Sequence, residues 1–237
     1  MFDTHIHLTE IEHAELLKLL ERPDFRYVSC GTDKKSIMAI SELTARFEHV
    51  YGALGIHPSF ADDAEALDSI KELIRNNSKL IAIGEAGLDA RYADMDRQIH
   101  IFEQQIILAE ETGLPIIVHN VRATDRIISL MERHPLQRYM IHGFSGSVET
   151  AKRLLLFDTY FGIGRTVTYG DARRLRSALS VIPRNRLLIE TDDPYMDRED
   201  MENDLYKVLK GLADILGMDQ EEVEYITDRN AEEAFSL

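Results

Sequence analysis

Short apolar runs that alternate with amphipathic stretches extend from one end of this chain to the other. Eight such runs are rich in Ile, Val, Leu, Ala and Gly, which is typical of strands buried on both faces of a parallel sheet. They cover residues 2–7, 27–31, 51–57, 80–85, 115–119, 139–142, 160–164 and 187–192. Helices are expected at 10–20, 34–47, 64–75, 96–112, 124–133, 148–157, 198–216 and 220–235.

Eight strands, most of them followed by a helix, in 237 residues predict an α/β fold of the (β/α)8 TIM-barrel type. A doubly wound open sheet is the competing architecture, but it usually has fewer strands and places its site at one crevice. Polar residues end five different strands here, and a closed barrel brings such ends together at one mouth. Because no linker interrupts the pattern, we predict a single domain over residues 1–237.

The composition limits the possible partners. The formal net charge of −15 argues against broad non-specific DNA binding, which depends on Lys and Arg at phosphates. No apolar stretch is long enough to span a membrane, and the N-terminus does not resemble a secretory signal. The single cysteine, Cys30, excludes an intrachain disulfide and fits a reducing compartment, so we expect a cytoplasmic protein.

The chemically informative residues end the predicted strands, where the active sites of barrels form. His5 and His7 share one face of the first strand, about 6–7 Å apart along it. The other strand ends carry Glu85, His119, His142 and Asp192. This donor set suits Zn²⁺, Mn²⁺ or Mg²⁺ and exceeds what one zinc ion with an open position needs. We therefore predict two divalent ions, about 3.5–4 Å apart, with a bridging carboxylate.

Other histidines and acids receive a structural interpretation. A lone His or acid after an apolar run is usually a core residue or a helix cap. The histidines in helical stretches are given that role: His13, His49, His100 and His134. Glu190 is also predicted to be structural, with its side chain facing away from the ligands. Asp3 is expected to support a ligand histidine.

Four residues are predicted to contact the substrate. His57 ends the third strand and can bind a metal, contact substrate or line the rim; we favour a role in lining the site. Arg122 and Arg165 can each clamp an anionic group, with a plain surface arginine as the alternative. Ser145 lies in a small turn whose N–H groups can face phosphate, although a helix N-cap at Ser147 explains this turn equally well.

These motifs resemble those of the TatD family of metal-dependent hydrolases, within the amidohydrolase-like barrels. The matching stretches are D-T-H-I-H (3–7), G-I-H-P (55–58), G-E-A-G-L-D (84–89), L-P-I-I-V-H (114–119), H-G-F-S-G (142–146), E-T-D-D-P-Y (190–195) and N-A-E-E-A-F (230–235). The resemblance implies that one ion is held by His5, His7, Glu85 and Asp192, and a second by Glu85, His119 and His142. Similar family members are described as deoxyribonucleases and phosphodiesterases, and some are linked to other ester substrates.

The expected reaction is hydrolysis by a metal-activated water. Two ions lower the pKa of the water, Asp192 takes its proton, and the ions with Arg122 or Arg165 stabilise charge on the substrate oxygen. The leading substrate is a phosphodiester, with DNA as the family default. Two alternatives are a small-molecule ester, lactone or amide, and a metal-loaded barrel that binds a partner without catalysis.

Two departures from the family pattern concern the substrate. Relatives often carry arginine two residues after the fifth-strand histidine, where this chain has Val121 and then Arg122. Residues 196–204 are rich in acids and lack the family's R-N-x-P motif. Because carboxylates around a groove disfavour a polynucleotide, the small-molecule substrate stays open.

Overall fold

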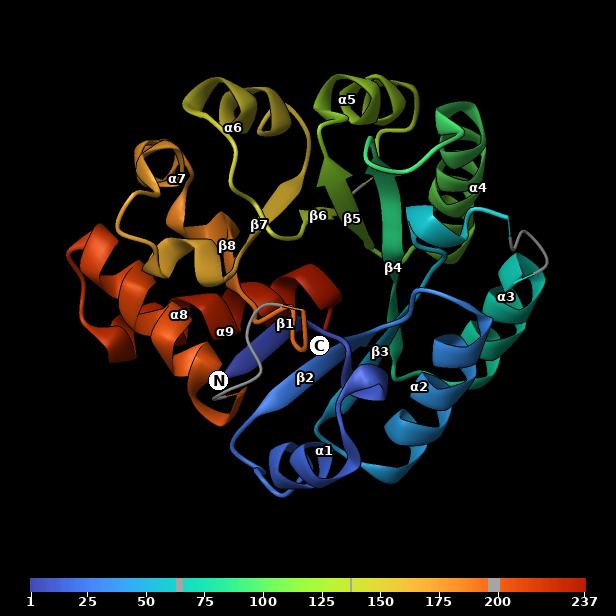
Figure 1. The fold of residues 1–237 in the computed structure, drawn as a ribbon, viewed down its shortest axis with the longest axis horizontal. Helices are drawn as coiled ribbons and strands as arrows, with labels where there is room; N and C mark the ends of the chain where they lie inside the picture. The colour runs from blue at the N-terminus through green and yellow to red at the C-terminus, as the bar shows by residue number, and fades with distance from the viewer. Residues whose placement is uncertain (63–65, 137, 196–200) are drawn as a thin grey trace.

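The computed structural model describes residues 1–62, 66–136, 138–195 and 201–237. Eight parallel strands stand side by side in chain order and form a nearly closed barrel (Figure 1). They are β1 (Phe2–Ile6), β2 (Arg26–Cys30), β3 (Val50–Leu54), β4 (Leu80–Asp89), β5 (Ile116–Val121), β6 (Tyr139–Ile141), β7 (Thr159–Ile163) and β8 (Leu187–Ile189). The predicted (β/α)8 architecture is confirmed.

Helices surround the strands (Figure 1) and bury their apolar faces against them. They are α1 (His13–Leu20), α2 (Lys34–Arg46), α3 (Ala66–Asn76), α4 (Met95–Thr112), α5 (Thr124–Arg133), α6 (Val148–Leu154), α7 (Arg173–Leu179), α8 (Met201–Leu216) and α9 (Gln220–Phe235). Short 3₁₀ turns η1 (Leu8–Glu10), η2 (Pro58–Phe60), η3 (Arg165–Thr168) and η4 (Arg184–Arg186) link some of these elements. Among the described residues, no helix combines the length and apolarity that crossing a bilayer requires.

Hydrogen bonds join the first strand to the turn after the last one. The N–H of Asp192 donates to the carbonyl of His5 at 2.9 Å. The buried carboxylate of Asp3 accepts from the N–H of Thr191 at 3.1 Å and from its hydroxyl at 2.7 Å. Asp3 reaches His5 through the backbone N–H, at 3.3 Å. Asp3 therefore supports His5 through the backbone and not through the imidazole. Its other hydrogen bonds join β1 to the segment after β8.

One end of the barrel is closed by α9. The apolar cluster inside the barrel contains Phe2, Val28, Cys30, Ala53, Ile81, Ala82, Ile117, Met140, Tyr160 and Leu188. Ala231, Ala234 and Phe235 of α9 belong to the same cluster, and the rings of Phe235 and Phe2 are 6.0 Å apart. Because Phe2 begins β1, α9 covers the N-terminal ends of the strands. The C-terminal ends stay open for a site.

Candidate metal centre

Four donor atoms meet at the open end of the barrel. The Nε2 atoms of His5, in β1, and His7, just after it, are 3.2 Å apart. Each lies 3.4–3.6 Å from Oε2 of Glu85 and from Oδ1 of Asp192. Ligands bound at about 2.1 Å to a tetrahedral ion lie about 3.4 Å from one another. The donors of His5, His7 and Glu85 therefore fit a single divalent ion, and Asp192 lies within 3.6 Å of both imidazoles.

Cys30, at the end of β2, contacts the Nδ1 atoms of both imidazoles, on the side opposite to Glu85. Nδ1 of His7 donates to the carbonyl of Cys30 at 3.0 Å. Because a carbonyl can only accept, the proton of the neutral ring sits on Nδ1, and Nε2 keeps the lone pair that a metal ion needs. Nδ1 of His5 lies 3.3 Å from the Cys30 sulfur. Burial raises the pKa of this thiol well above its usual value.

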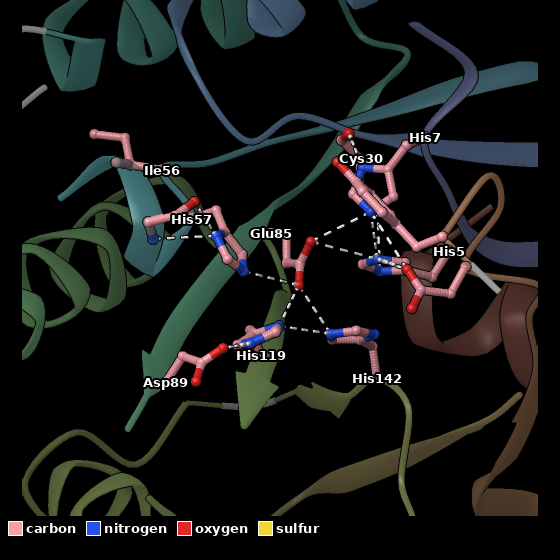
Figure 2. A network of polar contacts seen from close by, with 12 residues as sticks. His5, His7, Cys30, Ile56, His57, Glu85, Asp89, His119 and His142 are labelled. Atoms are coloured by element: carbon pink, nitrogen blue, oxygen red, sulfur yellow. Dashed lines mark hydrogen bonds and ion pairs between the residues drawn. The ribbon is translucent and has the colours of Figure 1, made fainter. Parts of the chain in front are cut away.

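The carboxylate of Glu85 faces two separate pairs of histidines. Its Oε2 is directed at His5 and His7, and its Oε1 lies 2.5 Å from Nδ1 of His119 and 2.8 Å from Nε2 of His142. Figure 2 shows Glu85 between the two pairs. Burial alone would raise the pKa of Glu85, but the charge of His142 and the contacts with the neighbouring histidines hold it well below its usual value. A carboxylate in this position can bridge two ions.

Glu85 does not end its strand, as the sequence suggested, because β4 continues to Asp89. The pairing register between β4 and β5 shifts between Ile83 and Ala86, and the strand resumes beyond this irregularity. His119 likewise lies inside β5. The extension of β4 carries Asp89 to the site, where its Oδ2 accepts from Nε2 of His119 at 3.1 Å.

Glu190 was predicted to face away from the ligands, and this prediction is wrong. Its Oε1 accepts from the N–H of Gly143 at 2.5 Å and lies 3.8 Å from Nδ1 of His142. The reason is that β8 ends at Ile189, and Asp192 adopts a left-handed backbone with φ of 61°. The strand alternation therefore stops before Asp192, and both carboxylates reach the histidines.

Two glycines leave room for these side chains. A Cβ on Gly87 would lie 2.0 Å from the carbonyl oxygen of His119, so only glycine lets β4 approach β5 this closely. A Cβ on Gly162 would lie 2.0 Å from Oε2 of Glu190. The second glycine therefore provides the space for the carboxylate beside His142.

His57 lies next to the predicted ligands, after the end of β3. Its Nδ1 accepts from the N–H of Ser59 at 3.1 Å, so the proton of the neutral ring is on Nε2. That atom lies 3.9 Å from Oε1 of Glu85. Burial lowers the pKa of His57 to about 4, so the ring is neutral at ordinary pH. An Nε2–H group has no lone pair for a metal, which favours a site-lining role.

A cavity of about 430 Å³ lies over these residues. His57 lines it, together with the partly exposed rings of Phe60, Tyr92 and Tyr195. The other predicted substrate contacts lie elsewhere: Arg165 lines an adjacent cavity of about 200 Å³, and Arg122 and Ser145 line another of about 390 Å³.

Two sequence-based alternatives concern the segments beside these cavities. Ser147 does cap α6, because its hydroxyl accepts from the N–H of Thr150 at 3.2 Å.

Within the acidic stretch 196–204, residues 196–200 lie outside the described residues. Asp204 is buried, and its Oδ1 lies 2.7 Å from Nζ of Lys207. This acid is therefore not a rim group, because its side chain is buried and paired with Lys207.

A barrel with histidines and carboxylates gathered at the C-terminal ends of its strands is the architecture of metal-dependent hydrolases. The family model described as TatD related DNase matches residues 2–236, so the chain belongs to the TatD family of metal-dependent hydrolases.

Relatives of this chain include both hydrolases and a nuclease by name. An uncharacterized metal-dependent hydrolase, YabD of Bacillus subtilis, is 33% identical, with 100% of this chain and 99% of YabD covered. The 3'-5' ssDNA/RNA exonuclease TatD of Citrobacter rodentium is 30% identical over 87% of this chain and 85% of that protein. The crystal structure of the TatD homolog YjjV from Escherichia coli matches with a TM-score of 0.91 and 26% identity, covering 100% of this chain and 98% of YjjV.

Proposed function

We propose that this protein hydrolyses phosphodiester bonds at a centre for two divalent ions, with a nucleic-acid strand as the leading substrate. The observation that carries the proposal is the position of Glu85, whose two oxygens face two different histidine pairs. The name of the Citrobacter relative, an exonuclease on single-stranded DNA and RNA, supports the substrate class. The ions are Zn²⁺, Mn²⁺ or Mg²⁺, which all accept nitrogen or oxygen donors.

In this proposal the first ion is held by His5, His7, Glu85 and Asp192, and the second by Glu85, His119 and His142. Divalent ions in these positions supply an acidified water and positive charge at the reacting phosphate. The histidines hold their lone pairs towards the ion positions because Cys30 and Asp89 accept hydrogen bonds from the opposite nitrogens of His7 and His119. These contacts favour the metal-binding tautomer at His7 and at His119.

Asp192 is the proposed general base. Burial alone would raise its pKa, but the contact with His7 and the charge of His142 lower it below its usual value. The carboxylate is therefore ionised at neutral pH and can accept a proton. It also lines the 430 Å³ cavity, where a water beside the substrate can reach it.

Side chains around the cavity suit a nucleotide. The Nε2–H of His57 faces the site and can donate to a phosphate oxygen, and the guanidinium of Arg91 is 58% exposed at the same wall. Phe60, Tyr92 and Tyr195 are 42–57% exposed, and such rings stack on unpaired bases. A small-molecule ester is the second candidate, favoured by the net charge of −15.

We further propose that residues 1–237 work as one domain in the cytoplasm. Elements from both ends of the chain share one core, since α9 packs on β1. The buried thiol of Cys30 suits a reducing compartment.

The proposal is tested by metal analysis followed by assays with single-stranded DNA, bis(p-nitrophenyl) phosphate and a lactone panel, each with Zn²⁺, Mn²⁺ and Mg²⁺. Asp192→Asn should keep its metal and lose about 10²–10⁴-fold in turnover. Asp68→Asn, on the exposed side of α3, is the matched control and should keep full activity. Hydrolysis of lactones without any phosphodiester cleavage would reject the proposal.

A further inference from the structure

Three cavities adjoin one another at the open end of the barrel. The 430 Å³ cavity over the predicted ligands shares Arg91, His119, His142 and Asp192 with the 200 Å³ cavity. The 200 Å³ cavity shares Asn120, Val121, His142 and Gly143 with the 390 Å³ cavity. A substrate that extends beyond the ligands in this direction therefore reaches the third cavity, which we call the arginine cavity.

The arginine cavity is lined by Arg122, which follows β5, and by Arg174 of α7, with the exposed Ser145 beside them. Both arginines are exposed, and among the described residues neither has a carboxylate within ion-pair distance. Two guanidinium groups at one cavity form a local positive site in a chain whose net charge is −15. Such a site attracts an anion regardless of the total charge.

The acids close to this cavity do not cancel its charge. Glu190 is buried below it, with Oε1 bound to the N–H of Gly143. Asp125, at the start of α5, is paired with Arg153 at 2.6 Å. Glu149 is an exposed residue on α6, and its pKa is lowered by its own backbone N–H and Ser147, then by Lys152 and, least, by Arg174. Of these three acids, Glu149 is the exposed one that interacts with an arginine of the cavity, Arg174.

The backbone conformation of Arg122 is a second observation that favours a binding role for the arginine cavity. Its φ of 54° is left-handed, which costs free energy for a residue with a Cβ. Such residues concentrate where a side chain has to be aimed at a ligand. The left-handed turn directs the chain from β5 into α5 and leaves the Arg122 side chain in the arginine cavity.

We propose that the arginine cavity binds the neighbouring phosphate of a strand whose scissile phosphate lies at the predicted metal ligands. This inference rests on the proposed function and adds a substrate requirement to it: chains with at least two phosphates are preferred over a single diester. Arg122 and Arg174 recognise the phosphate through paired N–H donors, and Ser145 adds a hydroxyl. The local positive charge also lets an acidic protein accept a polyanionic strand.

The test compares thymidine 5'-(p-nitrophenyl phosphate), which carries one phosphate, with oligothymidylates of three to six nucleotides, which carry two or more. Arg122→Gln and Arg174→Gln should each raise the KM for the oligomers about 10-fold to 100-fold and leave kcat nearly unchanged. The single-phosphate ester should change less than about 2-fold. Each variant should also reduce the salt dependence of oligomer binding by about 0.7 in the logarithmic slope.

Arg173→Gln is the matched control, because this exposed arginine is the neighbour of Arg174 on α7 and does not line the cavity. It should behave as the unaltered protein with both substrates. Unchanged oligomer kinetics in both cavity variants would overturn the second phosphate site. An equal loss on the single-phosphate ester would also overturn it, since the arginines would then act on the reacting phosphate.

Binding separates this proposal from the proposed function. If no phosphodiester is cleaved with any metal, the proposed function fails. Fluorescence anisotropy with labelled oligothymidylate in the presence of a chelator then tests the cavity alone. Weaker binding by Arg122→Gln and Arg174→Gln, but not by Arg173→Gln, would support the phosphate site, and equal binding by all three would reject it.

Discussion

The carboxylate of Asp89 accepts a hydrogen bond from Nε2 of His119, with 3.1 Å between the two atoms. Arg91 holds this carboxylate in turn, through Nη2 at 2.6 Å and Nε at 3.0 Å. Burial alone would raise the pKa of Asp89, but the hydrogen bonds from Arg91 and His119 lower this pKa to about 2. The ionised carboxylate keeps the proton of His119 on Nε2, so that Nδ1 faces Glu85 with its lone pair.

Asp89→Asn should therefore weaken metal binding about 10-fold to 100-fold. An asparagine amide can donate to Nε2 and thereby favour the tautomer whose Nδ1 carries the proton. Titration calorimetry with Zn²⁺ or Mn²⁺ measures the change. Asp125→Asn, which alters an exposed ion pair, is the control. Equal metal affinity in the Asp89 variant and the control would show that this hydrogen bond does not orient His119.

Metal should stabilise the fold, because the donors of the site come from strands that separate on unfolding. An ion at 100 times its Kd adds about 2.7 kcal/mol, which raises the Tm of a chain of this size by roughly 5–10 °C. Thermal melts with and without chelator measure the shift. Glu85→Gln should abolish most of it, whereas His57→Gln should keep it, since the lone pair of His57 is used by Ser59. A lost shift in His57→Gln would make His57 a ligand.

His57 should make the metal-free protein less stable as the pH falls. Its pKa is about 4 in the folded protein and near the ordinary 6.5 in the unfolded chain, because burial disfavours the charged ring. The unfolded chain therefore binds the proton first, and stability declines between pH 6.5 and pH 4, by about 3 kcal/mol in total. Urea unfolding should show a shallower decline for His57→Gln. His100→Gln, on exposed α4 surface, should match the unaltered protein.

Phe235→Ala should destabilise the barrel without altering its chemistry. The side chain is 3% exposed and packs near Phe2 at the closed end, away from the ligands. Its removal leaves a cavity that costs about 3–5 kcal/mol in the free energy of unfolding. Leu237→Ala, at a side chain that is 49% exposed, should cost far less. Urea unfolding measures both, and activity per folded molecule should stay constant. Reduced activity in folded Phe235→Ala would contradict this separation of the two ends.

The barrel could be predicted because each buried strand and amphipathic helix carries its own periodic pattern. Helix α7 was not predicted, and its composition explains why. Its seven residues include Arg173, Arg174 and Arg176, and it is too short to show two helical periods. Its buried side chains are Leu175, Ala178 and Leu179, which form a pattern only when the strands beside them are known.

The six residues predicted as metal ligands do lie together, although their binding of metal stays a prediction. Asp89 was missed because β4 was expected to end at Glu85, four residues earlier. Counting by two from Glu85 gives Gly87 and Asp89 on one strand face, which is the signal that identifies it. Glu190 was misassigned because alternation was extended past Ile189, where the strand has already ended.

The hydrogen bonds that join β1 to the turn after β8 also have a consequence during synthesis. His5 and His7 are translated with β1 and just after it, whereas Asp192 is translated only after all eight strands. A nascent or truncated chain without the last strand lacks Asp192 and the backbone contacts that place it beside His5 and His7. We therefore expect full metal binding only after β8 and the turn that follows it have been translated.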